Sequence, residues 1–559
     1  MSIKLTGYFS NSFIGKCVLL LYFWYHQSRC KKIITHWQEW NRQSWCYKKW
    51  HSYIEKRPRY LQSFLFQWSQ NWNKKISPFL DKFHYIGTQS WIVSWFIKGK
   101  KIWEQTAWNV KRWFVFGSLF FAIGTIWKGA LWVFLLLVLL VLGILILYDY
   151  EKTTLLLALF VFIDFTMRRF GGILGSIWDE LLLLGCIILW GYKMVINRKE
   201  SWYKWTPLDI PLFSFIALAI THVSLNALDL HVGIEGLRAM VQYMLWYFLV
   251  IQLLRTKKGA KQLFVTLVLV GTLLGLHGVY QYITGAEMLG NWVDSVETIR
   301  TRAYSIVYSP NVLGSVMTLF IPMALSLFFA ENKLMKKFLY LGSTAIMSLC
   351  LLVTFSRGAW LGFAIGIILF ALMKDKRFLF PIFIGGFLIY LLVPSISNRM
   401  IYMFSSSYWA RSAEGGRLYR WLEGWETLQA HNIWWGLGLG RYGGAVAINN
   451  KLSPFYMDNY YMKTLVEMGA IGLGLLLLLL YQVFIWGYRT TQLIPDNHDK
   501  TLVQGALAGV TGVIIHNFGE NIFEVPTMVT YFWIVVAFIM FMRNQYEKRY
   551  DDIENKRMN

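Results

Sequence analysis

The chain has 559 residues, of which 56% are hydrophobic and only 15% are charged, and its mean hydropathy is +0.41. A soluble protein carries closer to a quarter charged residues, so this composition excludes a cytosolic domain and predicts a membrane protein. The formal charge of +24 would indicate nucleic-acid binding in a soluble protein, but here it must first be assigned to one side of the bilayer.

Residues 1–112 form a basic, Trp-rich segment that differs from the rest of the chain. They contain 19 Lys and Arg residues against four acidic residues, and their Trp residues are interleaved with the cations. Indole rings prefer the membrane interface and cations attract anionic headgroups, so we predict a cytoplasmic or membrane-surface extension that contacts the lipid bilayer. No nucleic-acid recognition motif accompanies it, and no nucleic-acid partner is expected.

From residue 113 the sequence becomes a series of apolar runs of the length that a helix needs to cross a bilayer. They predict an all-α polytopic membrane protein with about 12–14 transmembrane helices. N-terminal transmembrane helices would occupy 113–204 and a transmembrane core 205–545. The predicted spans are 113–127, 130–148, 152–167, 173–194, 208–224, 237–254, 263–283, 310–330, 338–354, 358–373, 378–394, 460–487, 501–517 and 527–543.

The connections between the later spans alternate in charge. Those at 197–206, 255–261, 331–337 and 374–377 are short and basic. By the positive-inside rule they are cytoplasmic, as is the predicted tail 546–559. The remaining segments, which are then predicted to face outward, are 284–309, 355–358, the large extracytoplasmic loop 395–459, and 518–526.

These predicted outer segments nevertheless contain many arginines, namely Arg300, Arg302, Arg357, Arg399, Arg411, Arg417, Arg420 and Arg441. Cations beside spans on that side oppose the topology signal, which indicates a site that needs them. A guanidinium binds phosphate oxygens through two parallel hydrogen bonds, so such a site suits a lipid pyrophosphate or an acidic polymer. The alternative is that several of them pair with neighbouring carboxylates or lipid phosphates.

Arg357 is the most informative of these arginines, because it lies between two predicted spans with almost no loop to hold it. A charge at such depth is costly unless it faces a polar cavity or a partner, so it is a functional candidate. Gly358 and Gly362 would let backbone or substrate approach closely. The alternative is an arginine that caps carbonyl groups at a tight turn.

Four motifs carry a resemblance to a known family. They are Arg302-Ala303-Tyr304-Ser305 with Ser309-Pro310-Asn311-Val312-Leu313-Gly314, then Thr354-Phe355-Ser356-Arg357-Gly358-Ala359-Trp360-Leu361-Gly362, then Trp435-Gly436-Leu437-Gly438-Leu439-Gly440-Arg441-Tyr442, and Asp458-Asn459-Tyr460-Tyr461 with Glu467-Met468-Gly469-Ala470-Ile471-Gly472. In this order around one large loop, they resemble the O-antigen ligase and polymerase superfamily over roughly residues 205–545. Residues 1–112 lie outside the resemblance.

The resemblance implies a GT-C-like membrane glycosyltransferase without a bound metal or other cofactor. Such enzymes take a glycan from an undecaprenyl-pyrophosphate carrier on the outer side of the bacterial cytoplasmic membrane and transfer it to an acceptor sugar. The acceptor is lipopolysaccharide core in ligases and another lipid-linked repeat in polymerases. Arg302 and Arg357 match the family's functional arginines and are predicted to grip the pyrophosphate, with Arg300 close enough to replace Arg302.

The proton of the acceptor hydroxyl needs a base. Ligases carry a His-Asn pair just before the span that follows the large loop, whereas this chain has Asp458-Asn459. We predict that Asp458 is the base if burial raises its pKa, and the departure from His favours a polymerase over a ligase. The alternative is that Asp458 only pairs with an arginine.

Further predicted substrate contacts are Arg417, Arg420, His431, Asn459 and Glu467. His431 is a second candidate for the base, or it caps a loop helix. Glu467 orients an arginine or contacts sugar hydroxyls, or it is an interfacial helix end. The loop itself predicts an amphipathic helix over 416–431, followed by a flexible turn rich in glycine that would let the loop cover a bound lipid.

Two other classes of function remain as alternatives. A secondary transporter of bicarbonate or another small anion would also use arginines in a cavity, although the sequence has no pair of matching halves. A membrane scaffold with a recruiting N-terminal extension would leave Arg357 unexplained. No nucleotide-binding Gly-rich loop is found in the sequence, which disfavours an ATP-driven pump.

Overall fold

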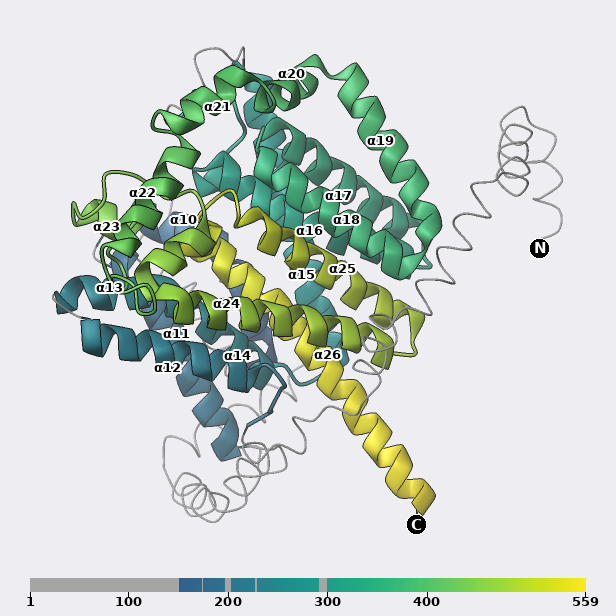
Figure 1. Cartoon of the computed structure of the whole chain (residues 1–559). Helices are drawn as coiled ribbons and strands as arrows, with labels where there is room; N and C mark the ends of the chain where they lie inside the picture. The colour runs from purple at the N-terminus through teal and green to yellow at the C-terminus, as the bar shows by residue number, and fades with distance from the viewer. Residues whose placement is uncertain (1–149, 173, 197–202, 227–228, 291–298, 559) are drawn as a thin grey trace, which may run out of the picture. The chain divides into compact units, whose positions relative to one another are not determined.

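The computed structural model describes residues 150–558 except 173, 197–202, 227–228 and 291–298 (Figure 1). Within these residues every regular element is a helix, which confirms the predicted all-α class. The extension 1–112 and the predicted spans 113–127 and 130–148 lie outside the described residues.

The helices are bounded as follows in chain order (Figure 1): η2 Tyr150–Lys152, α9 Thr153–Ala158, α10 Phe160–Phe170, α11 Leu174–Ile196, α12 Asp209–Asn226, α13 Leu230–Val241, η3 Gln242–Met244, α14 Leu245–Leu253, α15 Lys257–Thr284, η4 Ser305–Val307, α16 Pro310–Ala330, α17 Leu334–Val353, α18 Arg357–Lys374, η5 Lys376–Phe378, α19 Leu379–Leu392, α20 Pro394–Met403, α21 Ser406–Ala413, α22 Arg417–Gln429, α23 Ala445–Asn449, α24 Tyr460–Leu493, α25 Asn497–His516, η6 Ile522–Glu524 and α26 Pro526–Met558.

Among the described residues, seven helices are long and apolar enough to cross a membrane. The count rises to eight if the bent pair 376–392 and 394–403, which changes direction by 95°, is one span. Each predicted span after residue 150 coincides with one helix or with consecutive helices. The prediction of a polytopic membrane protein is therefore confirmed.

Local capping signals explain where several of these helices begin. Ser309 accepts a hydrogen bond from the amide of Val312, and Pro310 occupies the first helical position of α16, where its missing N–H costs nothing. Thr256 caps α15 in the same way through the amide of Gly259. The helix α16 begins at the first residue of the predicted span 310–330, whereas α15 begins six residues before the predicted span 263–283.

Small residues allow α16, α18 and α25 to pack closely. A Cβ added at Gly362 of α18 would lie 2.4 Å from the carbonyl oxygen of Gly512 in α25. One added at Gly509 would lie 2.2 Å from the carbonyl oxygen of Leu319 in α16. Such backbone-to-backbone contact is the usual basis of helix association in membranes. It holds the beginnings of α16 and α18 beside the end of α25.

Helix α24 is interrupted at Gly469, which has φ 65° and ψ −171°. The carbonyl groups of Val466 and Glu467, just before the break, accept hydrogen bonds of 3.0 and 2.8 Å from amides of segment 433–438. The two amides just after the break donate to carbonyl groups at 433 and 434. An interrupted helix is tolerated at membrane depth only when its freed backbone groups find partners, and this loop segment supplies them.

The glycines of the predicted flexible turn serve this close packing. A Cβ at Gly436 would lie 2.6 Å from the backbone nitrogen of Gly469, and one at Gly440 would lie 2.7 Å from the carbonyl oxygen of Val232. Both glycines have positive φ, a region that disfavours other residues. The expectation of a flexible turn is therefore corrected, since the backbone of this segment is packed against α24 and α13.

We expect Gly469→Ala to destabilise the protein by about 2–3 kcal/mol, because Ala disfavours this backbone conformation and its Cβ would lie 2.2 Å from the carbonyl oxygen of Trp434. The measurement is the apparent Tm in detergent. Gly474→Ala on the same helix is the matched control, because no atom lies within 4 Å of its added Cβ. Equal Tm values for the two variants would contradict the structural role of the break.

The connections gather at two ends of this bundle. At one end the amide of Ala303 donates to the carbonyl of Val353, and the amide of Tyr460 donates to that of Asn517. At the other end Lys261 lies 2.6 Å from Asp499, and Lys374 donates to Thr501. The predicted outer segments thus meet at one end and several of the predicted basic connections lie at the other.

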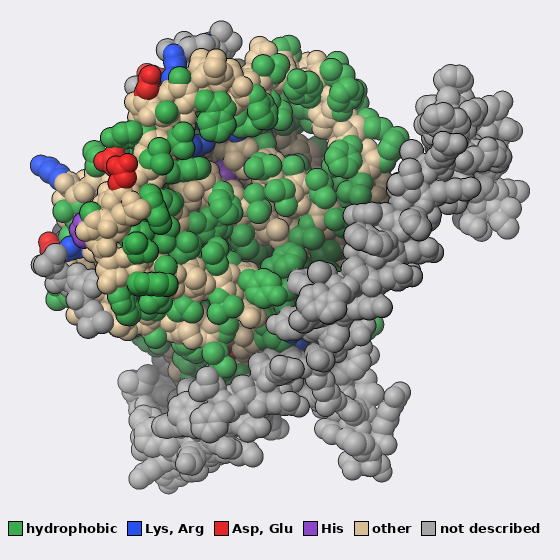
Figure 2. All heavy atoms as spheres, in the orientation of Figure 1, with side chains coloured by type: hydrophobic (Ala, Val, Ile, Leu, Met, Phe, Trp, Pro, Cys, Tyr) green, Lys and Arg blue, Asp and Glu red, His purple; other side chains and the backbone are tan. Residues whose placement is uncertain are grey.

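Helix α19 stands at the edge of the described bundle and buries none of its residues. Its Phe380, Phe383 and Phe387 are each more than 60% exposed. Figure 2 shows hydrophobic side chains spread over this face of the molecule, with a hollow beneath α20 and α21. An apolar surface of this kind is expected where helices face lipid rather than water.

Candidate functional site

Arg302 begins a chain of polar contacts at the end where the predicted outer segments meet. It is buried, with 5% of its surface exposed. Its Nε donates to the carbonyl of Thr354 at 2.8 Å, and its Nη2 donates to Oδ1 of Asn311 at 2.9 Å. The Asn311 side-chain amide in turn donates to Oε1 of Glu520, which follows α25. Residues of three separate segments are therefore linked.

Arg417, at the start of α22, joins two carboxylates to this group. Its Nη2 lies 3.7 Å from Oε1 of Glu520, and its Nε lies 3.9 Å from Oδ2 of Asp458. The Nη1 of Arg420 donates to Oδ2 of Asp458 at 2.7 Å and to the carbonyl of Tyr456 at 3.1 Å. We call Arg302, Arg357, Arg417, Arg420, Asp458 and Glu520 the arginine–carboxylate cluster.

Burial raises the pKa of the Glu520 carboxyl to about 7, with the nearby Asp458 carboxylate adding to the shift, whereas Arg417 and Arg302 oppose it. Burial also raises the pKa of Asp458 above its usual range, against the effect of Arg417 and Arg420. Burial lowers the pKa of Arg417, but Glu520, Asp458 and Tyr408 together raise it, and the net shift is upward. The arginine therefore stays charged.

Arg357 is the first residue of α18. Two residues before it, Phe355 has a φ of 50°, which marks a sharp turn. Its guanidinium carbon lies 4.8 Å from the centre of the Tyr408 ring, over which it makes a cation–π contact. Tyr408 also interacts with Arg417, which connects Arg357 to the other members of the cluster. The Nη1 of Arg357 is buried and has no hydrogen-bond partner among the described residues. A buried donor without an acceptor is costly, so this atom is poised to bind a ligand oxygen.

His516 holds the beginnings of α16 and α18 on the end of α25. Its Nδ1 lies 2.5 Å from Oγ of Ser315, and its Nε2 lies 3.5 Å from Oγ of Ser356. A Cβ added at Gly358 would lie 2.7 Å from the imidazole ring. His516 is fully buried, so its ring fixes the turn that presents Arg357.

In the structure four of the predicted site residues lie in one group, namely Arg302, Arg417, Arg420 and Asp458. Tyr408 links Arg357 to this group. It does not bring in Arg300, which is exposed and packs over Gly285. His431 is also exposed, and its Nδ1 lies 2.8 Å from the carbonyl of Thr427 at the end of α22, as the helix-cap alternative predicts. That helix spans Arg417–Gln429, close to the predicted 416–431.

Asn459 borders the cluster but has a structural role. Its side-chain oxygen caps α24 by accepting a hydrogen bond from the backbone amide of Met462 at 3.0 Å. Its backbone amide donates a hydrogen bond to Oδ1 of Asn521. These contacts fix the backbone next to Asp458, whose φ is +51°. Asn459 therefore helps to position Asp458, and its contact with a substrate stays a prediction.

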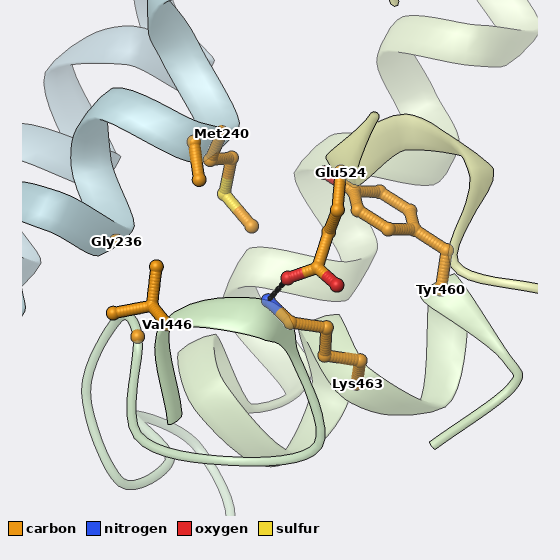
Figure 3. A pocket seen from close by; sticks show the side chains of 8 residues that line it. Gly236, Met240, Val446, Tyr460, Lys463 and Glu524 are labelled. Atoms are coloured by element: carbon orange, nitrogen blue, oxygen red, sulfur yellow. Dashed lines mark ion pairs between the residues drawn. The ribbon is translucent and has the colours of Figure 1, made fainter. Parts of the chain in front are cut away.

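Glu467 belongs to a second group of charges, in which Glu467 and Lys463 are buried. Its Oε2 lies 2.5 Å from Nζ of Lys463, which is also 3.0 Å from Oε1 of Glu524. Figure 3 shows Lys463 and Glu524 pointing toward each other beside Tyr460, with Met240 of α13 across the pocket. The pocket is lined by Gly236, Ala239, Met240, Gly440, Val446, Tyr460, Lys463 and Glu524. Glu467 thus pairs with a lysine and lies outside the arginine–carboxylate cluster.

The contacts that Asn311, Tyr408 and Glu520 make with the arginines were not predicted from the sequence. Asn311 had a usable signal, because a polar amide directly after the helix-starting Pro310 belongs to one of the recognised motifs. Tyr408 lies in a loop rich in aromatic residues, a pattern that predicts stacking on sugar rings rather than contact with an arginine. Glu520 lies four positions after His516, but its contact with Asn311 joins positions 209 apart in sequence.

In the part of the chain that the structure describes, no group of three or more His, Cys, Asp or Glu side chains is arranged to hold a metal ion. The cluster instead combines four arginines with two carboxylates, which leaves an excess of positive charge. Guanidinium groups and a carboxylate of raised pKa are suited to binding a phosphorylated group and to moving a proton.

Part of the chain matches a known protein family. Residues 342–477 match the family described as O-Antigen ligase (Wzy_C), a region that runs from within α17 to within α24 and contains Arg357, Arg417, Arg420 and Asp458. No curated protein matches the chain. Over residues 342–477 the family match confirms the similarity to the O-antigen ligase superfamily that the motifs predict.

Proposed function

We propose that the protein is a glycosyltransferase of the bacterial cytoplasmic membrane that polymerises or ligates undecaprenyl-pyrophosphate-linked oligosaccharides on the outer face. The O-antigen ligase match supports a lipid-linked glycan as substrate. The position of the arginine–carboxylate cluster, at the end opposite Lys261 and Lys374, supports an outward-facing site under the positive-inside rule.

The observation that carries the proposal is the Nη1 of Arg357, which is buried without a hydrogen-bond partner among the described residues, in a cluster with excess positive charge. When the sugar–phosphate bond breaks, negative charge grows on the leaving pyrophosphate. Preorganised cations that face this charge stabilise the transition state more than the ground state. Arg357 and Arg302 would bind the pyrophosphate, and Arg417 would neutralise charge as it develops.

The acceptor hydroxyl must lose its proton as its oxygen attacks the anomeric carbon, and a carboxylate of the cluster would accept that proton. We favour a polymerase over a ligase because Asp458 stands where the resemblance places the His of ligases. The acceptor would then be another lipid-linked repeat rather than a lipopolysaccharide core.

Deleting the gene in its host, and complementing it with the wild type or with Arg357→Ala, tests the proposal. The lipid-linked intermediates and the length of the envelope polysaccharide would be measured by mass spectrometry. Single lipid-linked repeats without long polymer would identify a polymerase, whereas full-length lipid-linked polymer would identify a ligase. Unchanged glycans in every strain would refute a glycosyltransferase and direct attention to anion uptake.

We expect a chelator to leave the rate of transfer unchanged within about twofold, because the arginines would supply the charge stabilisation that a divalent ion supplies elsewhere. The measurement is transfer by the purified protein with and without EDTA. Loss of activity with EDTA and its recovery on adding a divalent ion would overturn a metal-independent mechanism.

A further inference from the structure

The two carboxylates of the arginine–carboxylate cluster are held differently. Asp458 is tied directly to Arg420 at 2.7 Å and lies 3.9 Å from Arg417. Glu520 makes both of its described contacts through Oε1, one with the Asn311 amide and one with Arg417 at 3.7 Å. Each carboxylate therefore makes these contacts through one oxygen, but Asp458 accepts a short hydrogen bond from an arginine, whereas the arginine that pairs with Glu520 lies 3.7 Å away.

From this difference we infer that Glu520 is the residue that takes the proton from the acceptor hydroxyl, while Asp458 is a positioning residue that holds Arg417 and Arg420. The inference rests on the proposed function. The acceptor oxygen forms a bond to the anomeric carbon, and the bond from that carbon to the pyrophosphate oxygen breaks. The electron pair leaves with the undecaprenyl pyrophosphate, and the hydroxyl proton passes to the Glu520 carboxylate and then to water.

The contacts of Glu520 place it where such a base is needed. Asn311 bridges Glu520 and Arg302, so the carboxylate is one side chain away from a proposed pyrophosphate ligand. A base must lie near the reacting centre and must be able to take up a proton. Asp458 meets this requirement less well, because a strong ion pair stabilises its charged form and opposes protonation.

The charge around Glu520 supports the same assignment. The charged groups that face it are Arg302, Arg417 and Asp458, and the net effect with burial is a pKa of about 7. A base is most effective when its pKa is close to the working pH. The ordinary pKa of a glutamate would make it a weaker acceptor for a hydroxyl proton.

The experiment compares the full-length wild type with Glu520→Gln and Asp458→Asn in phospholipid vesicles. The donor probe is the pool of lipid-linked saccharides extracted from cells that lack the gene. We would measure kcat and KM for the donor between about pH 5.5 and 8.5, around the expected pKa near 7. Glu414→Gln, a change at an exposed glutamate of the loop, is the matched control.

We expect Glu520→Gln to lower kcat about 10²–10³-fold with little change in KM, and to abolish the fall of kcat below pH 7 that the wild type shows. Asp458→Asn should raise KM for the donor, because it disturbs Arg417 and Arg420. It should keep the fall of kcat below pH 7, which we call the acidic limb, because it leaves the base in place. Glu520→Asp should keep the acidic limb at a lower kcat, which tests the assignment even if Glu520→Gln does not fold.

The inference is overturned if Glu520→Gln retains the wild-type kcat or the acidic limb, if Glu520→Asp lacks that limb, or if Asp458→Asn loses it. These results differ from a failure of the proposed function. In that case the wild type itself would transfer no sugar between lipid-linked saccharides, whatever residue occupied position 520.

Discussion

Arg357→Ala should abolish glycan transfer while leaving membrane insertion intact. Arg357 begins α18, its side chain contacts the Tyr408 ring at 4.8 Å, and one of its guanidinium nitrogens is buried without an acceptor in the part of the chain that the structure describes. Removing it takes a proposed pyrophosphate ligand from the site and leaves no unpaired buried charge behind. Loss of one preorganised donor to a developing negative charge costs about 10²–10³ in rate. The measurement is polymer formation by the purified variant, with its elution profile as a check on folding.

Arg357→Lys separates charge from geometry at the same position. A lysine keeps the positive charge but is a single point donor, and it cannot make two parallel hydrogen bonds to phosphate oxygens. We therefore expect nearly as large a loss as with alanine. Arg377→Ala, which removes an exposed arginine beyond the other end of α18, should have no effect on transfer. Wild-type turnover in Arg357→Lys would refute a bidentate pyrophosphate clamp.

The helices of the membrane region were predictable because their signals are local. The run 310–330 coincides with α16, since Ser309 and Pro310 mark its beginning and an apolar stretch of spanning length follows. Arg357 could be singled out for the same reason, because an arginine between two apolar runs is visible in the sequence. Hydropathy and capping depend on neighbours in the chain, which the sequence displays directly.

The break in α24 was not predictable in this way. The predicted span 460–487 reads as one continuous apolar run, and a glycine such as Gly469 is common in transmembrane helices. What makes Gly469 a break is the insertion of segment 433–438, more than 30 positions earlier in the chain. Its hydrogen bonds depend on tertiary contacts, which no local pattern encodes.

The arginine–carboxylate cluster was likewise predictable only in part. The arginines could be found from their charge, but the choice between Asp458 and Glu520 depends on which of them meets Arg420 and which meets Asn311. The pairing of Glu467 with Lys463, in contrast, has a local signal in the sequence. Lys463 precedes Glu467 by four residues, the spacing at which side chains on one helix face meet.

The buried pair of Lys463 and Glu467 gives the largest effect that we expect on stability. Lys463→Met should destabilise the protein by about 3–5 kcal/mol, because removing one partner of a buried ion pair leaves an uncompensated charge. Here two carboxylates, those of Glu467 and Glu524, would lose their shared cation. Both are held in place, since Glu467 also accepts from the amide of Tyr442 and Glu524 from the side chain of Asn521. The measurement is the apparent Tm in detergent and the yield of monodisperse protein.

Two further variants distinguish a lost ion pair from a lost side chain. Lys336→Met breaks an exposed pair with Glu331, whose charged groups lie 3.9 Å apart, and exposed pairs contribute only about 0–1 kcal/mol. Adding Glu467→Gln to Lys463→Met should restore part of the Tm, because it removes one of the two buried charges that the single variant leaves facing each other. If Lys463→Met lowers the Tm no more than Lys336→Met does, the charges around Lys463 contribute little to stability.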